Sequence, residues 1–198
     1  MISVELVQQA HKALTPELRE YWHKRGVTDD FLDTLKIGFA QRGDWKWFTI
    51  PILDFHGKPL FFKMKKARGG PDNQPKGITW PKGNKATLYP LPYLHDNIRQ
   101  IFLCEGEPDC LAMLSNEMEA ISSTAGAKTF PEEFLDHFPR NIQVICCFDK
   151  DEAGKAGTEK VKQLFEEKRQ DIKFSIFRIP EDCPGKDMTD YFLWKNGS

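Results

Sequence analysis

The second half of the chain alternates short apolar runs with segments of helical periodicity. Turn-forming or charged residues bound each apolar run, as is typical of buried parallel strands. Strands that alternate with helices imply right-handed βαβ units, so we expect a mainly parallel sheet of about four strands flanked by helices. The expected strands are 101–104, 120–123, 142–148 and 174–177, and the expected helices are 108–116, 131–138, 155–169 and 188–194.

The first half has a different pattern. Three short helical segments precede a β-like stretch, in which two runs flank a turn at 54–57 as in an antiparallel hairpin. Residues 67–87 are rich in Gly, Pro and Lys and lack periodicity, which predicts a long loop. The sequence therefore predicts an α+β N-terminal subdomain over residues 1–95 and an α/β domain over residues 96–198. The expected elements before the hairpin are helices 4–14, 16–24 and 28–35 and a short strand 37–39.

Charge divides the chain at the same place. The whole chain carries 28 Lys and Arg against 29 Asp and Glu, a net charge of −1. Residues 1–95 hold 15 of the basic and 9 of the acidic residues, whereas residues 96–198 hold 13 and 20. Within residues 57–85, eight basic residues occur with a single acidic one, Asp72. A basic half joined to an acidic half suits an enzyme that binds a polyanion and uses a metal ion.

Cysteine usage and hydropathy exclude other classes. No apolar run approaches the roughly 18 residues of a membrane span, and no basic-then-apolar leader begins the chain, so we expect a cytoplasmic protein. The five cysteines include no C-x-x-C pair, which argues against a zinc ribbon. We expect buried free thiols and no zinc.

Acidic residues follow the expected strands of the second half. Glu105 comes directly after strand 101–104, Asp149 and Asp151 come after strand 142–148, and Asp187 follows the fourth strand. Carboxylates at the carboxyl ends of parallel strands meet at the edge where open α/β sheets bind ligands. Because converging carboxylates repel one another unless a cation neutralises them, the pattern predicts a site for Mg²⁺ or Mn²⁺.

Simpler interpretations exist for each acidic segment. The residues around Asp149 and Asp151 could be a charged turn that caps the following helix, and Asp187 alone could be another helix cap. A calcium loop is excluded, because Ala153 cannot ligate at its fifth position and Lys160 stands where the bidentate Glu belongs. The order of all three segments behind successive strands favours a shared metal site.

This arrangement resembles the Toprim domain, which bacterial and phage primases share with type IA and II topoisomerases and several nucleases. The matching segments are Leu-Cys-Glu-Gly-Glu-Pro-Asp at 103–109, Phe-Asp-Lys-Asp-Glu-Ala-Gly at 148–154, Lys186-Asp187 with Asp190, and the small-residue turn at 123–126. Fragments in the first half occur in the order seen in the basic N-terminal subdomain of bacterial-type primases: 21–27, 37–39, 50–57, 75–76 and 88–89. The chain therefore resembles the RNA-polymerising core of such a primase.

The resemblance implies nucleotidyl transfer that makes short RNA primers, with roles for individual residues. Asp149 and Asp151 would hold the principal Mg²⁺ or Mn²⁺, Asp187 would help complete its shell, and Glu105 would be a further ligand or the proton acceptor. Asp109 would orient neighbouring groups. The implied partners are a single-stranded DNA template, NTPs, a replicative helicase and a separate zinc-binding module. The residues expected to bind nucleic acid or NTP are Lys63, Lys65, Lys66, Arg68, Lys76, Lys82 and Lys85.

The chain also departs from the primase pattern. It has neither zinc-ribbon cysteines before the core nor a G-x-x-x-x-G-K-[ST] phosphate loop. We therefore expect a stand-alone primase of a phage or other mobile element, or a fragment of a longer protein, without a fused helicase. Two alternatives stay open: a Toprim nuclease that cleaves nucleic acid, and a non-catalytic module that binds nucleic acid or a partner.

Overall fold

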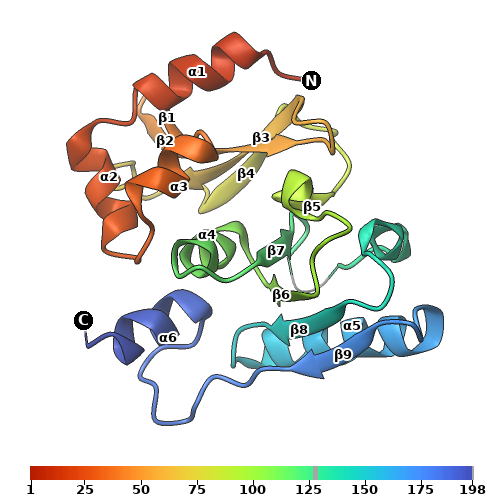
Figure 1. Ribbon diagram of the computed structural model, residues 1–198. Coiled ribbons are helices and arrows are strands. Elements are labelled where there is room, and N and C mark those ends of the chain that lie inside the picture. Colours follow the sequence, from red (N-terminus) through yellow and green to blue (C-terminus); the bar gives the residue numbers. More distant parts are fainter. Residues whose placement is uncertain (127–128, 198) are drawn as a thin grey trace. The chain divides into compact units, whose positions relative to one another are not determined.

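The computed structural model describes residues 1–126 and 129–197. They form two compact units, Met1–Lys85 and Ala86–Ser198, which are described separately below (Figure 1). The sequence suggested a boundary at residue 95. The structure has it earlier because strand β5 (Leu88–Tyr89) pairs antiparallel with β7 (Ala120–Ser123) and so belongs to the second unit.

The second unit is built on a five-stranded sheet in the order β5-β7-β6-β8-β9. Its four longer strands are parallel, which confirms the expected parallel sheet. The antiparallel edge strand β5 was not predicted, because two residues carry no periodic signal. The central and outer strands are β6 (Gln100–Cys104), β8 (Gln143–Cys147) and β9 (Lys173–Ile176).

Helices cover both faces of this sheet (Figure 1). The β6–β7 and β8–β9 crossovers run in opposite directions along the sheet, so right-handed connections place their helices on opposite faces. Helix α4 (Glu107–Ser115) contacts α6 (Met188–Lys195), while α5 (Glu152–Lys168) contacts η2 (Glu132–His137). The helix predicted at 131–138 is this short 3₁₀ helix η2.

Apolar side chains of the strands form the core of the second unit. Leu103 and Val144 are fully buried, and they belong to one cluster with Phe134 of η2 and Phe165 of α5. Because successive strand residues point to opposite faces, this cluster fixes which residues of β6 and β8 face α5. The carboxyl ends of both strands are thereby held at one edge, where the acidic segments begin.

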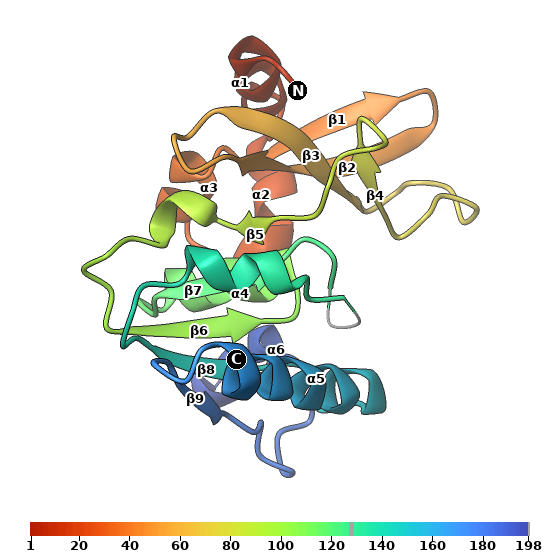
Figure 2. The same cartoon turned by 90° about the vertical axis from the view of Figure 1, so that its right-hand side faces the viewer.

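The first unit contains a four-stranded antiparallel sheet in the order β1-β2-β3-β4 (Figure 2). Helix α1 packs on one face, where Val7 and Ala10 join a buried cluster with Trp47, Phe62 and Met64. The predicted hairpin is the β2–β3 pair, whose turn is held by Asp54. The elements are α1 (Val4–Lys12), α2 (Pro16–His23), α3 (Asp29–Thr34), β1 (Gly38–Arg42), β2 (Trp45–Leu53), β3 (Pro59–Lys66) and β4 (Gly77–Trp80); η1 (Leu91–Tyr93) belongs to the second unit.

The segment predicted as a loop at 67–87 is more regular than its composition suggests. Residues 77–80 form β4, which pairs with β3, and the connection before β4 is ordered by the buried side chain of Gln74. This amide accepts a hydrogen bond from the Lys46 backbone N–H at 3.0 Å and donates one to the Lys46 carbonyl at 2.6 Å. An amide side chain therefore replaces a β-ladder partner here, which periodicity could not show.

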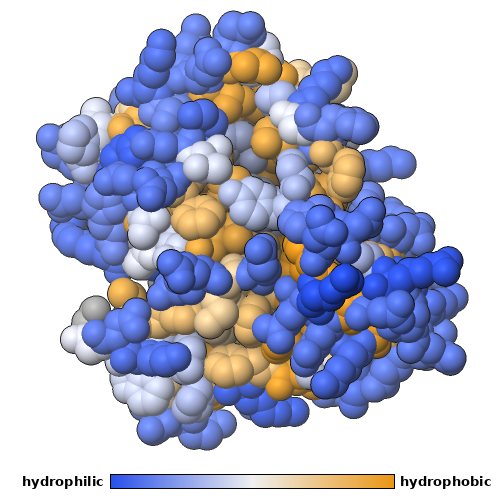
Figure 3. All heavy atoms as spheres, in the orientation of Figure 1, coloured by the Kyte–Doolittle hydropathy of each residue, from blue (hydrophilic) through white to orange (hydrophobic). Residues whose placement is uncertain are grey.

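Among the described residues, no helix is both long and apolar enough to span a bilayer. On the face shown in Figure 3, hydrophilic side chains make up much of the visible surface, with smaller hydrophobic areas between them.

A substitution of Gly154, in the first turn of α5, tests how closely this helix packs against the end of β8. A Cβ at this position would lie 2.1 Å from the Asp149 carbonyl oxygen, so Gly154→Ala must shift the helix or Asp149. We expect this substitution to lower the free energy of unfolding by about 1–3 kcal/mol and the melting temperature by roughly 3–10 °C. Gly106→Ala is the control, because its Cβ would meet nothing closer than 3.6 Å. Equal melting temperatures for the two variants would contradict this packing argument.

Candidate active site

The first two acidic segments meet at the carboxyl ends of β6 and β8. These strands are parallel neighbours with Cys104 opposite Cys147, so Glu105 and Asp149 leave the sheet close to each other. The Asp149 backbone N–H donates a hydrogen bond of 3.3 Å to Oε2 of Glu105. Burial raises the pKa of Glu105, and the negative charge of Asp149 raises it further. Two of the predicted site residues are thus adjacent and electrostatically coupled.

Lys186 lies between the two aspartates of the second segment. Its Nζ is 2.6 Å from Oδ2 of Asp149 and 2.7 Å from Oδ2 of Asp151. These hydrogen bonds raise the pKa of Lys186, and the same ammonium lowers the pKa of Asp151. The Asp149 side chain is 13% exposed and the Asp151 side chain is 42% exposed, so the two ion pairs of Lys186 are only partly accessible to water.

Asp151 and Asp187 also cap helices. Oδ1 of Asp151 accepts the Gly154 N–H at 3.0 Å at the start of α5, and Oδ1 of Asp187 accepts the Asp190 N–H at 2.8 Å at the start of α6. Both residues are therefore helix caps, as the alternative interpretation predicted. Each cap uses one carboxylate oxygen, and in Asp151 the other oxygen contacts Lys186.

Asp109 lies in the first turn of α4 and links it to α6. Its Oδ1 accepts hydrogen bonds from the hydroxyl of Thr189 at 2.8 Å and from the Thr189 backbone N–H at 3.3 Å. Burial raises the pKa of Asp109 to about 7, with a further contribution from the charge of Asp187. Asp109 is therefore a partly buried group that joins the third acidic segment to the first, and its orienting role stays a prediction.

Sequence reasoning gave no role to Lys150, which fixes the loop that carries the third segment. Its Nζ donates hydrogen bonds to the carbonyls of Cys183 at 2.6 Å and Pro180 at 3.4 Å. Its backbone N–H donates to the Lys186 carbonyl at 2.9 Å. Lys186 was quoted in the motif but also received no role. The sequence signal that could have suggested a role for Lys150 and Lys186 was their position, inside or next to the acidic segments.

The donor set fits a hard cation. In the part of the chain that the structure describes, no three His, Cys, Asp or Glu side chains converge as they would around a metal ion. The two aspartates instead share one ammonium, so a cationic position between carboxylate oxygens already exists. Burial, and then the charge of neighbouring carboxylates, raises the pKa values of Glu105 and Asp109, so a nearby cation would favour their ionised forms. Carboxylate oxygens are the ligands that Mg²⁺ and Mn²⁺ prefer.

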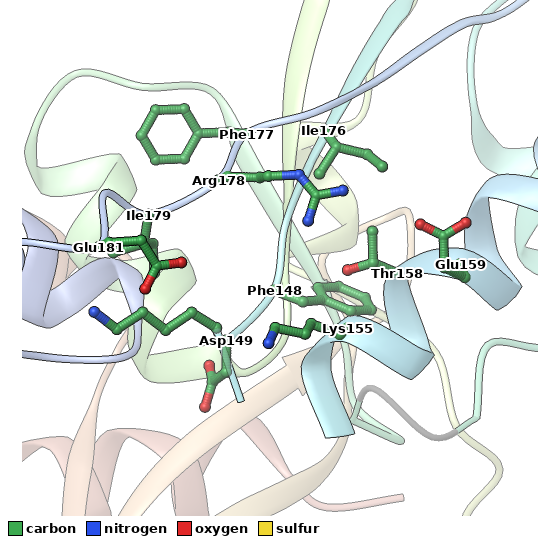
Figure 4. Close-up of a pocket in the computed structure, with 11 residues that line it drawn as sticks. Phe148, Asp149, Lys155, Thr158, Glu159, Ile176, Phe177, Arg178, Ile179 and Glu181 are labelled. Atoms are coloured by element: carbon green, nitrogen blue, oxygen red, sulfur yellow. The ribbon is translucent and has the colours of Figure 1, made fainter. Parts of the chain in front are cut away.

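A cavity of about 140 Å³ lies beside this edge, between the end of β8, the first turns of α5 and the segment after β9 (Figure 4). Phe148 and Ile179 are its buried apolar wall, and Arg178 and Lys155 contribute positive charge. It is smaller than the roughly 300–1,000 Å³ of typical ligand pockets. The carboxylate edge is therefore the better candidate for the chemistry.

The predicted basic residues of the first unit differ in their surroundings. Lys63 and Lys65 alternate with buried residues of β3 and so share one face of the strand. Lys66 faces the other way, and its Nζ donates a 2.7 Å hydrogen bond to the Pro71 carbonyl, which gives it a structural role in the following loop. Four of the predicted residues are exposed: Arg68, Lys76, Lys82 and Lys85.

Comparison with known proteins identifies the second unit. Residues 102–192 match a family described as Toprim-like. The DNA primase of Haemophilus influenzae is 30% identical over 194 residues, which cover 78% of this chain and 33% of that primase. The chain spans between 24% and 37% of the length of the curated primases that it matches.

Solved structures agree on the fold of nearly the whole chain. The Aquifex aeolicus primase, with its zinc-binding and RNA polymerase domains, superposes with a TM-score of 0.77 at 18% identity, covering 98% of this chain and 56% of that one. A DnaG primase catalytic domain bound to single-stranded DNA gives a TM-score of 0.73 at 20% identity, covering 98% and 73%. The second unit therefore belongs to the Toprim-like family, and the chain has the fold of a bacterial-type DNA primase catalytic core.

Proposed function

We propose that this chain is the catalytic core of a DNA primase, which synthesises short RNA primers on single-stranded DNA by metal-dependent nucleotidyl transfer. The observation that carries the proposal is the meeting of Glu105, Asp149 and Asp151 at the carboxyl edge of a Toprim-like sheet. The similarity to primases over most of the chain supports a polymerase in preference to a nuclease.

In the reaction, a 3′-hydroxyl attacks the α-phosphate of an NTP and pyrophosphate leaves. Asp149 and Asp151 would hold the divalent cation, Asp187 would help complete its shell, and Glu105 would be a further ligand or accept the proton. When bound there, Mg²⁺ or Mn²⁺ would lower the pKa of the attacking hydroxyl and neutralise charge that develops on the phosphates. Asp109 keeps α4 and α6 together and so positions the third acidic segment.

The basic residues of the first unit serve the polyanionic substrates. Lys63 and Lys65 on β3, together with exposed lysines near β4, would bind template phosphates or the triphosphate of the NTP. The Aquifex protein carries a zinc-binding domain beside its polymerase domain. A comparable module and a replicative helicase would be the partners of this chain in the cytoplasm, with the zinc module reading the template.

Removal of the two aspartate charges tests the catalytic role. The double variant Asp149→Asn/Asp151→Asn keeps side-chain shape and the helix cap but loses the oxygen charge that holds a cation. We expect primer synthesis with Mg²⁺ or Mn²⁺, NTPs and a single-stranded template to fall at least about 100-fold, beyond the 10–100-fold typical of groups that only orient ligands.

The control is Asp136→Asn, an exposed aspartate on η2, which should leave primer yield unchanged. Separation of the RNA products by size distinguishes a primase from the two alternatives, a nuclease and a non-catalytic binding module. Template degradation without synthesis would favour a nuclease. If the wild type binds template but neither it nor the double variant makes or cleaves nucleic acid, the non-catalytic binding module would replace the present proposal.

The role of the basic face can be measured through salt dependence. Lys63→Gln/Lys65→Gln should weaken binding of single-stranded DNA and lower the slope of log affinity against log salt by about 0.7 for each phosphate that the variant no longer neutralises. Fluorescence anisotropy with a labelled oligonucleotide provides both quantities. Lys12→Gln/Lys36→Gln removes the same charge from exposed positions elsewhere in the first unit. Equal slopes for both double variants would count against phosphate binding by β3.

A further inference from the structure

Lys186 occupies the position in which a divalent cation would neutralise Asp149 and Asp151. One ammonium nitrogen contacts Oδ2 of both carboxylates, at 2.6 and 2.7 Å, which are the lengths of strong charge-assisted hydrogen bonds. The other oxygen of Asp151, Oδ1, caps α5. Oδ2 of Asp151 is therefore the oxygen left for either the ammonium or a metal ion, and Oδ2 of Asp149 lies beside it on the same ammonium.

The backbone of Lys186 is fixed while its side chain can move. Its N–H donates to Oδ2 of Asp190 at 3.0 Å, and its carbonyl accepts the Lys150 N–H at 2.9 Å. Gly185 packs so closely against Asp190 that a Cβ there would lie 2.0 Å from the Asp190 Cβ. In contrast, the Lys186 side chain is 55% exposed on a flexible four-carbon stem. Displacement of the ammonium would therefore break none of the hydrogen bonds that hold the loop.

An ammonium and a divalent cation cannot share these oxygens. Both ions are positive, and at a separation of a few ångströms in a partly buried site they would repel each other strongly. Without either ion, the carboxylates of Asp149 and Asp151 would repel each other and the neighbouring Glu105. A cation therefore stabilises the site whether or not a metal ion is bound, and the chain carries one of its own.

We propose that Lys186 is a positioning residue whose ammonium holds Asp149 and Asp151 together in the metal-free protein and is displaced when a divalent cation binds. The inference rests on the metal site of the proposed function. It assigns to Lys186 two effects: it stabilises the empty site, and it weakens the binding of free metal ions by competing with them.

The test compares Lys186→Met with a matched lysine variant, Lys155→Met. Lys155 lies in the first turn of α5 and pairs with exposed Glu152 at 3.0 Å, so this control removes the same charge nearby without touching the aspartates. Mn²⁺ binding is measured on the whole chain by the electron paramagnetic resonance signal of free Mn²⁺. Melting temperatures are recorded in EDTA and in saturating Mn²⁺. Lys186→Gln and the charge-retaining Lys186→Arg are measured in parallel.

We expect Lys186→Met and Lys186→Gln to bind Mn²⁺ about tenfold more tightly than the wild type, equivalent to about 1.4 kcal/mol. Both should have a lower melting temperature than the wild type in EDTA. Saturating Mn²⁺ should raise their melting temperatures by more than it raises that of the wild type. Lys186→Arg and Lys155→Met should resemble the wild type. If the wild type binds Mn²⁺ but removal of the Lys186 charge gives no gain in Mn²⁺ affinity, the proposed displacement of the Lys186 ammonium is overturned. The metal site remains supported in that case. If no variant binds Mn²⁺, the metal site itself is overturned and this proposal with it.

Discussion

Mutual repulsion among carboxylates is the constraint on which the second unit depends. The parallel pairing of β6 and β8 forces Glu105 and Asp149 to the same edge of the sheet, and the segment after β9 adds Asp187. Burial makes this costly, as the raised pKa values of Glu105 and Asp109 show. Such a cluster is stable only if a cation lies among the acids or some of them stay protonated. In this structure the ammonium of Lys186 is that cation.

The surrounding contacts serve to keep this cluster in place. Lys150 holds the 180–186 loop against the end of β8, and Asp109 ties α4 to α6 through Thr189. Asp151 and Asp187 each use one oxygen to cap a helix. Fold and chemistry therefore share the same side chains. For this reason an alanine at Asp151 would mix loss of a helix cap with loss of a ligand, whereas asparagine can retain the cap.

Much of this arrangement could be predicted from the sequence. Apolar runs that end in Glu105 and Asp149 indicated parallel strands with acids at one edge, because strand length and boundaries are local signals. Strands β4 and β5 were missed, since segments of four and two residues beside prolines are too short to show alternation. The contacts of Lys186 were missed too, because its partners lie 37 and 35 positions away and are brought to it by tertiary packing.

We propose that the carboxyl edge of the second unit is a cation site built from Asp149 and Asp151. Anomalous X-ray scattering from crystals of the whole chain grown with Mn²⁺ tests it most directly. We expect an anomalous peak between the Oδ2 atoms of Asp149 and Asp151, with the Lys186 ammonium moved away from both. A saturating Mn²⁺ concentration that leaves no peak there, with Lys186 still bridging the two aspartates, would contradict it.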